Sequence, residues 1–310
     1  MHGSSNGRGA GPRLLLILSS ERSGSTLTRV VLGEHSLIVA PAEMFLLRYP
    51  DFRTWREQKP VAIESLVELF GLAGQPKSAA EIDTHCRSFS TLQVYEWLAT
   101  FLRPGTFLLD KTPAYSNDGT ALRRSVPLSP FYIWLVRHPL GVIESHVRIK
   151  REARRKTGGW KGFRRRVRDT LEGYGSLAHR GMTPLARQRE IKWVVQQTII
   201  REFLSTVPDD RQCRIRFEEL VSDPASVVRR LCGALGLEVE PRMLEVCSER
   251  RVMNVHLGDP NFHKHDRIDP ATAYAWKEHF SEDALTLETR RLMAALEIEG
   301  GDSGKIGPSP

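Results

Sequence analysis

The sequence predicts an α/β fold, in which a parallel β-sheet is flanked by helices on both faces. Short, mostly apolar runs recur along the chain, and segments with helical spacing lie between them. Continuous apolar runs are typical of strands that are buried on both faces, and parallel strands need crossover segments to connect them. Alternation of strands and helices therefore favours this class. The predicted strands cover residues 13–19, 106–109, 131–136 and 213–217.

Helices are predicted where apolar residues recur every three or four positions. One of them, 225–235, has a clear beginning and end: Ser222 or Asp223 can cap it, Pro224 suits its first turn, and Gly236 suits its end. Residues 151–168 are dense in Arg, Lys and Gly and are predicted to form an exposed excursion. The predicted helices cover residues 26–35, 61–70, 92–102, 140–149, 188–205, 225–235, 271–280 and 284–296.

The composition fits one globular domain. The chain has 310 residues, of which 40% are hydrophobic and 26% charged, which allows a substantial buried core. We expect a single domain over residues 13–299, a flexible leader or linker over 1–12 and a flexible tail over 300–310. The formal net charge of +8 suggests an anionic partner such as a nucleotide, a nucleic acid or an acidic protein, although a solvated basic surface gives the same balance.

Cysteine spacing and hydropathy bear on compartment and metal content. The cysteines form no Cys-X-X-Cys pair and no zinc-spaced cluster with histidine, so we expect free thiols, a reducing cytoplasmic environment and no metal. The apolar run 14–18 is too short to span a bilayer, and we expect no membrane partner. The four cysteines are Cys86, Cys213, Cys232 and Cys247.

A polar turn over residues 20–27 follows the first predicted strand and opens a helix. We call these residues the phosphate loop, because their pattern can wrap an anion. Gly24 lets the backbone approach closely, and the helix that follows adds its positive N-terminal end. Arg22 supplies a fixed cation, while Ser25 and Thr26 supply hydroxyl donors. A plain strand-to-helix turn would show a similar pattern.

The phosphate loop differs from that of nucleoside-triphosphate kinases. The GxxxxGK[ST] pattern of those enzymes requires a lysine and a longer glycine spacing, and both are missing here. Asp110 is a conceivable magnesium carboxylate at a strand end. A nucleotide kinase with a degenerate loop therefore remains an alternative, which magnesium-dependent ATP binding would support.

The phosphate loop resembles the 5′-phosphosulfate loop of sulfotransferases that use 3′-phosphoadenosine-5′-phosphosulfate (PAPS). In that family the loop follows a buried strand and holds the 5′-phosphate of the donor without a metal. The resemblance implies PAPS as cofactor and adenosine 3′,5′-bisphosphate as its product. The positions that match are Arg22, Ser23, Gly24, Ser25, Thr26 and Leu27.

A second anion site is predicted at the end of the strand 131–136. Arg137 follows this strand directly, and Ser145 lies further on in the next predicted helix. An arginine fork and a serine hydroxyl can grip one phosphate together. The pair resembles the family's 3′-phosphate motif, which implies that Arg137 and Ser145 bind the 3′-phosphate of PAPS.

The resemblance also implies residues for the transfer itself. Sulfuryl transfer needs a base for the acceptor hydroxyl and cations for the charge that develops on the leaving phosphate. Glu43, in Pro41-Ala-Glu-Met-Phe45, matches the general base of tyrosylprotein and heparan-type sulfotransferases. Lys111 matches a strand-end lysine that neutralises the sulfonate or bridging oxygen, a task that Arg22 would share. Asp110 is interpreted as orienting one of these cations, and two neighbours, Tyr115 and Ser116, are expected to shape the acceptor pocket.

Residues 256–267 form a polar stretch rich in histidine. Three histidines there raise the question of zinc, but no second ligand cluster supports it. Sulfotransferases commonly close a late loop over the adenosine and 3′-phosphate, so the resemblance implies that His263, Lys264 and Arg267 bind the cofactor. His256 is a second candidate for the catalytic base.

A narrower resemblance is to sulfotransferase domains embedded in polyketide synthases, of the type that forms terminal alkenes. It covers roughly residues 14–280, including Asp110-Lys-Thr-Pro-Ala-Tyr-Ser116 and the segment from Gly258 to Lys277. In that group the acceptor is a β-hydroxyl on an acyl chain carried by an acyl carrier protein. Carrier proteins are acidic, so the basic stretch 148–168 is a candidate docking surface.

Two other functions stay open at this point. One is a free-standing sulfotransferase that acts on the hydroxyl of a small molecule, a carbohydrate or a protein. The other is a basic nucleic-acid-binding module, for which the stretch 148–168 is the main support; it offers few aromatic residues for base stacking beyond Trp160 and Phe163. We therefore expect PAPS and a hydroxylated acceptor as partners, and no nucleic acid.

Overall fold

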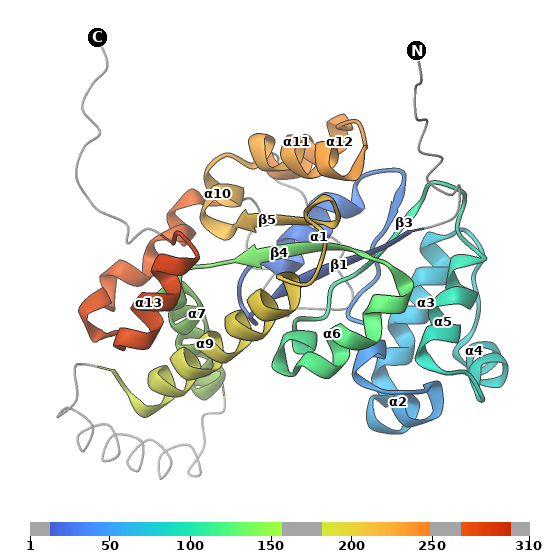
Figure 1. The fold of residues 1–310 in the computed structure, drawn as a ribbon, viewed down its shortest axis with the longest axis horizontal. Helices are drawn as coiled ribbons and strands as arrows, with labels where there is room; N and C mark the ends of the chain where they lie inside the picture. The colour runs from blue at the N-terminus through green and yellow to red at the C-terminus, as the bar shows by residue number, and fades with distance from the viewer. Residues whose placement is uncertain (1–12, 157–181, 249–267, 299–310) are drawn as a thin grey trace.

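The computed structural model describes residues 13–156, 182–248 and 268–298. Five strands form one parallel sheet in the order β2-β3-β1-β4-β5 (Figure 1). This confirms the predicted α/β class. The strands are β1 (Arg13–Ser19), β2 (Ile38–Val39), β3 (Phe107–Asp110), β4 (Phe131–Val136) and β5 (Gln212–Arg216).

The central strand β1 is buried on both faces. Leu14, Leu16 and Leu18 belong to one hydrophobic cluster, whereas Leu15 and Ile17 belong to another. Successive side chains of a strand point to opposite faces, so each cluster covers one face of the sheet. This double burial explains why the sequence of β1 is an uninterrupted apolar run.

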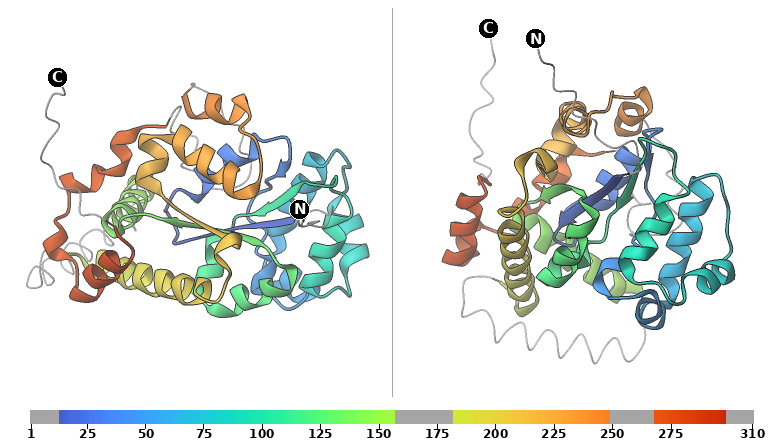
Figure 2. Two further views of the ribbon diagram at one scale, coloured as in Figure 1. Left: turned by 45° about the horizontal axis from the view of Figure 1, so that its top comes forward. Right: turned by 45° about the vertical axis from the view of Figure 1, so that its right-hand side comes forward.

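Helices cover both faces of the sheet, as predicted (Figures 1 and 2). In Figure 1, α11 and α12 lie above the sheet, and α6 and α9 lie below it. The Leu15 face is covered by α1 (Ser25–Gly33), α10 (Phe217–Ser222), α11 (Pro224–Leu235) and α12 (Pro241–Ser248). The Leu16 face is covered by α2 (Phe52–Gln58), α3 (Ile63–Leu72), α4 (Ala79–Cys86), α5 (Thr91–Ala99), α6 (Gly119–Ser125), α7 (Pro139–Lys156), α9 (Pro184–Leu204) and α13 (Leu287–Ala295).

Short 3₁₀ helices connect these elements. Their bounds are η1 (Leu46–Arg48), η2 (Pro60–Ala62), η3 (Pro113–Asn117), η4 (Val126–Leu128), η5 (Asp209–Arg211), η7 (Pro270–Ala273), η8 (Ala275–Glu278) and η9 (Glu282–Ala284). Within the described ranges, no helix combines the length and the apolar composition needed to cross a membrane.

Two predictions for the C-terminal half were wrong. Residues 271–280 do not form one helix but two short 3₁₀ turns, η7 and η8, separated at Tyr274, whose φ of −119° and ψ of 7° leave the helical region. Residues 151–156, predicted as part of an excursion, continue α7 as a helix. The remainder of that excursion, 157–168, lies outside the described residues.

The order of the strands predicts a binding crevice at one edge of the sheet. From β1 the chain passes to β2 and β3 on one side, then crosses to β4 and β5 on the other. Ligands of open α/β sheets bind beside the carboxyl ends of the strands, where the strand order reverses. Here that point lies between β1 and β4. The phosphate loop follows β1 and Arg137 follows β4, so the fold brings these motifs to the same crevice.

The start of α11 offers a test of the predicted helix cap. The Asp223 side chain accepts a hydrogen bond from the Ser226 N–H at 3.0 Å, and Pro224 occupies the first turn. Asp223→Ala should lower the free energy of unfolding by about 1 kcal/mol. Asp223→Asn keeps a capping oxygen and should lower that free energy by only about 0.3 kcal/mol. Urea unfolding of the three proteins measures both values; equal losses would show that the cap does not stabilise α11.

Candidate active site

The phosphate loop follows a backbone path that favours glycine at one position. Gly24 has a φ of 92°, and a Cβ there would lie 2.3 Å from Cδ2 of Phe217. Both the left-handed conformation and the lack of space exclude a larger residue. Arg22 also has a positive φ, 66°. A left-handed non-glycine residue costs about 1–2 kcal/mol, so the rest of the site stabilises this strained turn.

Helix α1 begins in the phosphate loop with an uncapped end. Gly24 is its N-cap and offers no side chain to accept from the first-turn N–H groups, and the first turn carries no acidic residue. These N–H groups and the helix dipole together favour an anion at this end. Ser23, Ser25 and Thr26 are all buried beside it.

Arg22, Arg137 and Ser145 meet at the carboxyl ends of β1 and β4. Nε of Arg22 donates to Oγ of Ser145 at 3.2 Å, and Nη1 of Arg137 donates to the carbonyl of Arg22 at 2.9 Å. The structure thus brings together the residues that the sequence assigned to two separate phosphates. The Ser145 hydroxyl is hydrogen-bonded to Arg22, and the sequence did not predict this pairing.

Arg137 is a buried cation. It is 7% exposed, and its guanidinium lies 4.1 Å from the centroid of the Phe217 ring. Burial lowers the pKa of Arg137 from 12.5 to about 10, although Glu218 and Glu144 favour its charged form. The guanidinium therefore stays charged near neutral pH. Nη2 donates to the carbonyl of Thr272 at 3.1 Å, while within the described part of the chain Nε has no hydrogen-bond partner.

Lys111 and Glu43 form an ion pair beside the start of α1. Nζ of Lys111 lies 2.7 Å from Oε1 of Glu43 and donates to Oγ1 of Thr26 at 3.3 Å. Lys111 is 1% exposed, whereas the Glu43 side chain is 30% exposed. The lysine is thus fixed in the interior, and the carboxylate faces the accessible side of the pair.

A buried network holds the two members of this pair at a set separation. Asp110 directly precedes Lys111, and its carboxylate accepts from Tyr95 at 2.5 Å and from Tyr115 at 2.6 Å. Thr112 donates to Asp110 at 2.8 Å and accepts from the N–H of Phe45 at 3.3 Å. Burial raises the pKa of Asp110, whereas its three hydroxyl donors lower it. Thr112 therefore connects the strand end that carries Lys111 to the loop that carries Glu43.

Helix α9 closes the site on the Leu16 face of the sheet. Gln197 donates to Oγ of Ser20 at 3.5 Å and accepts from Trp134 at 2.9 Å. Gln196 donates to Asn117 at 2.8 Å. Lys192 lies 2.6 Å from Glu21. One helix therefore contacts the phosphate loop and the segment that follows Lys111.

His138 links Arg137 to the late segment of the chain. Its ring stacks on Trp276 with 4.3 Å between centroids and 3° between planes. Nδ1 accepts from the N–H of Leu140 at 3.2 Å, so Nε2 carries the proton and donates to Glu282 at 3.1 Å. Burial, with help from Arg216, lowers the pKa of His138 from 6.5 to about 3. The ring is therefore neutral and serves in packing.

A family model described as the sulfotransferase family matches residues 14–241, which is most of the chain. The chain belongs to the sulfotransferase family. No curated protein sequence matches the enzyme, whereas solved structures do, among them two sulfotransferase domains. It is 32% identical to the "Sulfotransferase Domain from the Curacin Biosynthetic Pathway", with a TM-score of 0.72, over 93% of this chain and 98% of that one.

The second similar structure is the "Sulfotransferase Domain from the Synechococcus PCC 7002 Olefin Synthase". The sulfotransferase described here is 26% identical to it, with a TM-score of 0.73, over 96% of this chain and 99% of that one. These similarities confirm the predicted sulfotransferase family and the predicted resemblance to sulfotransferase domains of polyketide pathways. They leave the kinase and nucleic-acid-binding alternatives without support.

Several predicted site residues are either fully buried or outside the described ranges. Tyr115 and Ser116 are fully buried, so neither side chain presents surface to an acceptor here, and their role in substrate binding stays a prediction. The late-loop residues His256, His263, Lys264 and Arg267 fall in the range 249–267, outside the described residues. Their roles also stay predictions.

The sequence analysis missed three residues that shape the site. Phe217 ends the predicted strand 213–217 and Glu218 follows it, and neither stands in a motif that indicates a binding site. The Phe217 ring supports Arg137, and Glu218 accepts from the N–H of His138 at 2.9 Å. Thr112 follows Lys111 directly. Its hydrogen bond with the N–H of Phe45 could not be predicted, because Phe45 lies far away in the sequence.

Other features lie away from this cluster. A cavity of about 920 Å³ opens beside the amino ends of β2 and β3, where Ser36, Arg103 and Thr106 line it. Among the described residues, none of the predicted catalytic or cofactor residues lines that cavity. Among the described residues, no three His, Cys, Asp or Glu side chains group as metal ligands would.

The low pKa of His138 makes the stability of the enzyme depend on pH. The unfolded chain takes up a proton below about pH 6.5, whereas the folded protein does so only near pH 3. Protonation therefore favours the unfolded state, and the free energy of unfolding should fall as the pH drops from about 6.5 towards 3. His146, whose pKa burial lowers to about 4, adds to the same trend.

Urea unfolding at about pH 7.5 and about pH 5 checks this expectation. His138→Gln should lose less stability between the two pH values than the unmodified protein, because glutamine does not titrate. An equal loss in both proteins would place the effect elsewhere.

Proposed function

We propose that the enzyme transfers the sulfuryl group of PAPS to an acceptor hydroxyl without a metal. The observation that carries this proposal is the ion pair of the buried Lys111 with the partly exposed Glu43 at the uncapped start of α1. It sets a cation and a base beside an anion site, which is the combination that transfer to a hydroxyl requires.

The residues of the crevice suit the two phosphates of PAPS. The N–H groups at the start of α1, with Ser25 and Thr26, would hold the 5′-phosphosulfate. Arg137 and Ser145 would hold the 3′-phosphate, together with Arg22. The buried Nε of Arg137, which lacks a partner within the described ranges, fits a bound anion. PAPS supplies the activated sulfuryl group.

Residues of the chain accept the proton and stabilise the negative charge that develops during the transfer. Glu43 takes the proton of the acceptor hydroxyl, whose oxygen then forms a bond to sulfur. The bond from sulfur to the bridging oxygen breaks, and the leaving phosphate keeps the electron pair. Lys111 stabilises the negative charge on the transferred group and the bridging oxygen, and Arg22 that on the phosphate. The products are a sulfate ester and adenosine 3′,5′-bisphosphate.

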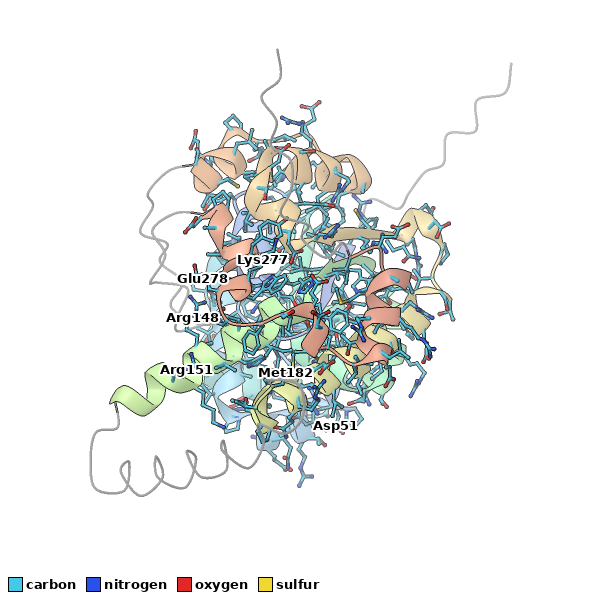
Figure 3. The ribbon with its side chains drawn as sticks, turned by 90° about the vertical axis from the view of Figure 1, so that its left-hand side faces the viewer. Asp51, Arg148, Arg151, Met182, Lys277 and Glu278 are labelled. Atoms are coloured by element: carbon cyan, nitrogen blue, oxygen red, sulfur yellow. The ribbon has the colours of Figure 1, made fainter. Side chains whose placement is uncertain are left out.

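For the acceptor, we favour the β-hydroxyl of an acyl chain bound to a carrier protein. Two sulfotransferase domains, one of a biosynthetic pathway and one of an olefin synthase, are similar over nearly the whole chain. Helix α7 also leaves the body of the molecule with Arg148 and Arg151 exposed on it, near Lys277 (Figure 3). A basic surface of this kind suits an acidic carrier.

A panel of hydroxylated substrates tests the acceptor. It should contain carrier-bound 3-hydroxyacyl chains, the same chains free of carrier, and simple phenols, sugars and tyrosine peptides. Transfer from labelled PAPS should be fastest to the carrier-bound chain. Faster transfer to a free small molecule, a carbohydrate or a peptide would replace our first choice with a free-standing enzyme.

Cofactor binding should depend on the fork of Arg137. Arg137→Lys keeps the charge but loses the planar guanidinium, which both stacks on Phe217 and donates to two carbonyls. We expect adenosine 3′,5′-bisphosphate to bind at least about tenfold more weakly, a loss of about 1.4 kcal/mol. Calorimetric titration without magnesium measures the affinity.

Arg214→Lys provides the control, because Arg214 is an exposed cation on the neighbouring strand β5. The affinity of the Arg214→Lys variant for adenosine 3′,5′-bisphosphate should match that of the unmodified enzyme. If the unmodified enzyme binds no adenosine 3′,5′-bisphosphate at all, the proposed donor is wrong.

Turnover should depend on the carboxylate of Glu43. Glu43→Gln cannot accept a proton, so we expect kcat to fall by about 100-fold or more, the usual contribution of a general base. The affinity for adenosine 3′,5′-bisphosphate should stay within about twofold, because the assigned phosphate contacts are unchanged. A variant that keeps the full rate across the pH range would exclude Glu43 as the base and leave His256 as the next candidate.

A further inference from the structure

Three side chains from two helices surround a carboxylate in the phosphate loop. Glu21 lies 2.6 Å from Nζ of Lys192, 3.9 Å from Nη1 of Arg189 and 3.9 Å from Nε2 of His146. Lys192 and Arg189 lie on α9, one turn apart, and His146 lies on α7. We call these four residues the Glu21 cluster. None of the motifs assigned to PAPS includes Lys192, Arg189 or His146.

The Glu21 cluster carries an excess of positive charge. Burial, with help from Arg189, lowers the pKa of His146 to about 4, so its ring is neutral near pH 7. Lys192 and Arg189 therefore share one carboxylate, and Arg22 adds a third cation next to Glu21 in the chain. Among the described residues, the buried Nε of Arg189 has no hydrogen-bond partner. The cluster thus has hydrogen-bonding capacity that a second anion can use.

Two segments of the site adjoin the Glu21 cluster. Glu21 precedes Arg22, whose side chain contacts Ser145. On α9, one turn after Lys192, Gln196 donates to Asn117, the last residue of η3. That short helix begins just after Lys111 and Thr112. The phosphate loop and α9 therefore connect the Glu21 cluster to both of these segments.

The ion pairs of the cluster are open to exchange. The side chains of Glu21, Lys192 and Arg189 are 35%, 33% and 29% exposed. Partly exposed pairs of this kind are weaker than fully buried ones and are screened in part by salt. A phosphate group offers more acceptor oxygens than a carboxylate, and Lys and Arg bind it through charge-assisted hydrogen bonds. It can therefore displace Glu21 from both cations.

We infer that Arg189 and Lys192 form a subsite for a negatively charged group on the acceptor, with Glu21 as the internal anion that occupies it when no acceptor is bound. The inference rests on the proposed function. For a carrier-bound chain, the matching group is the phosphate of the phosphopantetheine arm. For a free hydroxy acid, it is the carboxylate. The subsite makes the enzyme select acceptors by charge as well as by the reacting hydroxyl.

A pair of probes that differ only in the phosphate tests this subsite. The probes are a 3-hydroxyacyl phosphopantetheine and the same 3-hydroxyacyl pantetheine without its phosphate. Their binding is measured by calorimetry on the full chain saturated with adenosine 3′,5′-bisphosphate. The unmodified enzyme should bind the phosphorylated probe about tenfold more tightly, as expected for charge-assisted bonds.

Variants of the cluster should change this preference. Lys192→Ala and Arg189→Ala should each remove most of it, with the unphosphorylated probe unaffected, and Lys192→Arg should retain it. Glu21→Gln removes the competing carboxylate and should tighten binding of the phosphorylated probe about threefold. The matched control is Arg53→Ala, because Arg53 forms an exposed ion pair with Glu57 on α2, away from the crevice.

The outcomes separate the subsite from the proposed function. The inference is overturned if the unmodified enzyme shows no preference, if Lys192→Ala weakens both probes equally, or if it weakens adenosine 3′,5′-bisphosphate instead. A free 3-hydroxy acid that responds to the same variants would support the subsite and identify a carboxylate as its ligand. Preference without any sulfuryl transfer would contradict the proposed function while leaving the subsite intact.

Discussion

The buried guanidinium of Arg137 is the interaction on which the rest of the crevice depends. It follows β4, donates to the carbonyl of Arg22 in the phosphate loop and to that of Thr272 in η7, and stacks on Phe217 at the start of α10. Four distant segments are therefore joined by one cation. Burying a charge costs free energy unless partners compensate it, and Glu218 and Glu144 favour the charged form. The strained turn at Arg22 is stabilised by the same contact.

The second constraint is the fixed distance between Glu43, the proposed base, and the Lys111 cation. Lys111 is placed by the end of β3, whereas Glu43 lies on a loop that follows β2. Thr112 and Asp110 connect the two through buried hydrogen bonds, and α3 holds the loop from its other side, where Ser65 donates to the carbonyl of Glu43 at 3.0 Å. Catalytic groups need supporting contacts of this kind to keep their geometry.

The sequence predicted the parts of the fold that local patterns determine. The buried strands β1, β3 and β4 appear as apolar runs, and the cap of α11 appears as Asp223-Pro224. Strand β2 has two residues and shows no period, so only its pairing with β3 reveals it. The turns at 270–278 have helical spacing, but Trp276 packs on His138 instead of continuing a helix. In the site, Arg22, Arg137 and Lys111 stand in motifs, whereas Phe217 and Lys192 act through partners far away in the sequence.

The close contact between Gly24 and Phe217 limits which substitutions this crevice can accept. A side chain at position 24 would collide with the aromatic ring. A smaller residue at position 217 would relieve the collision but remove the surface on which Arg137 stacks. Neither position can drift by itself without loss to the other two. Positions 24, 137 and 217, distant along the chain, are therefore coupled through one aromatic ring, and a change at any of them disturbs the packing of the other two.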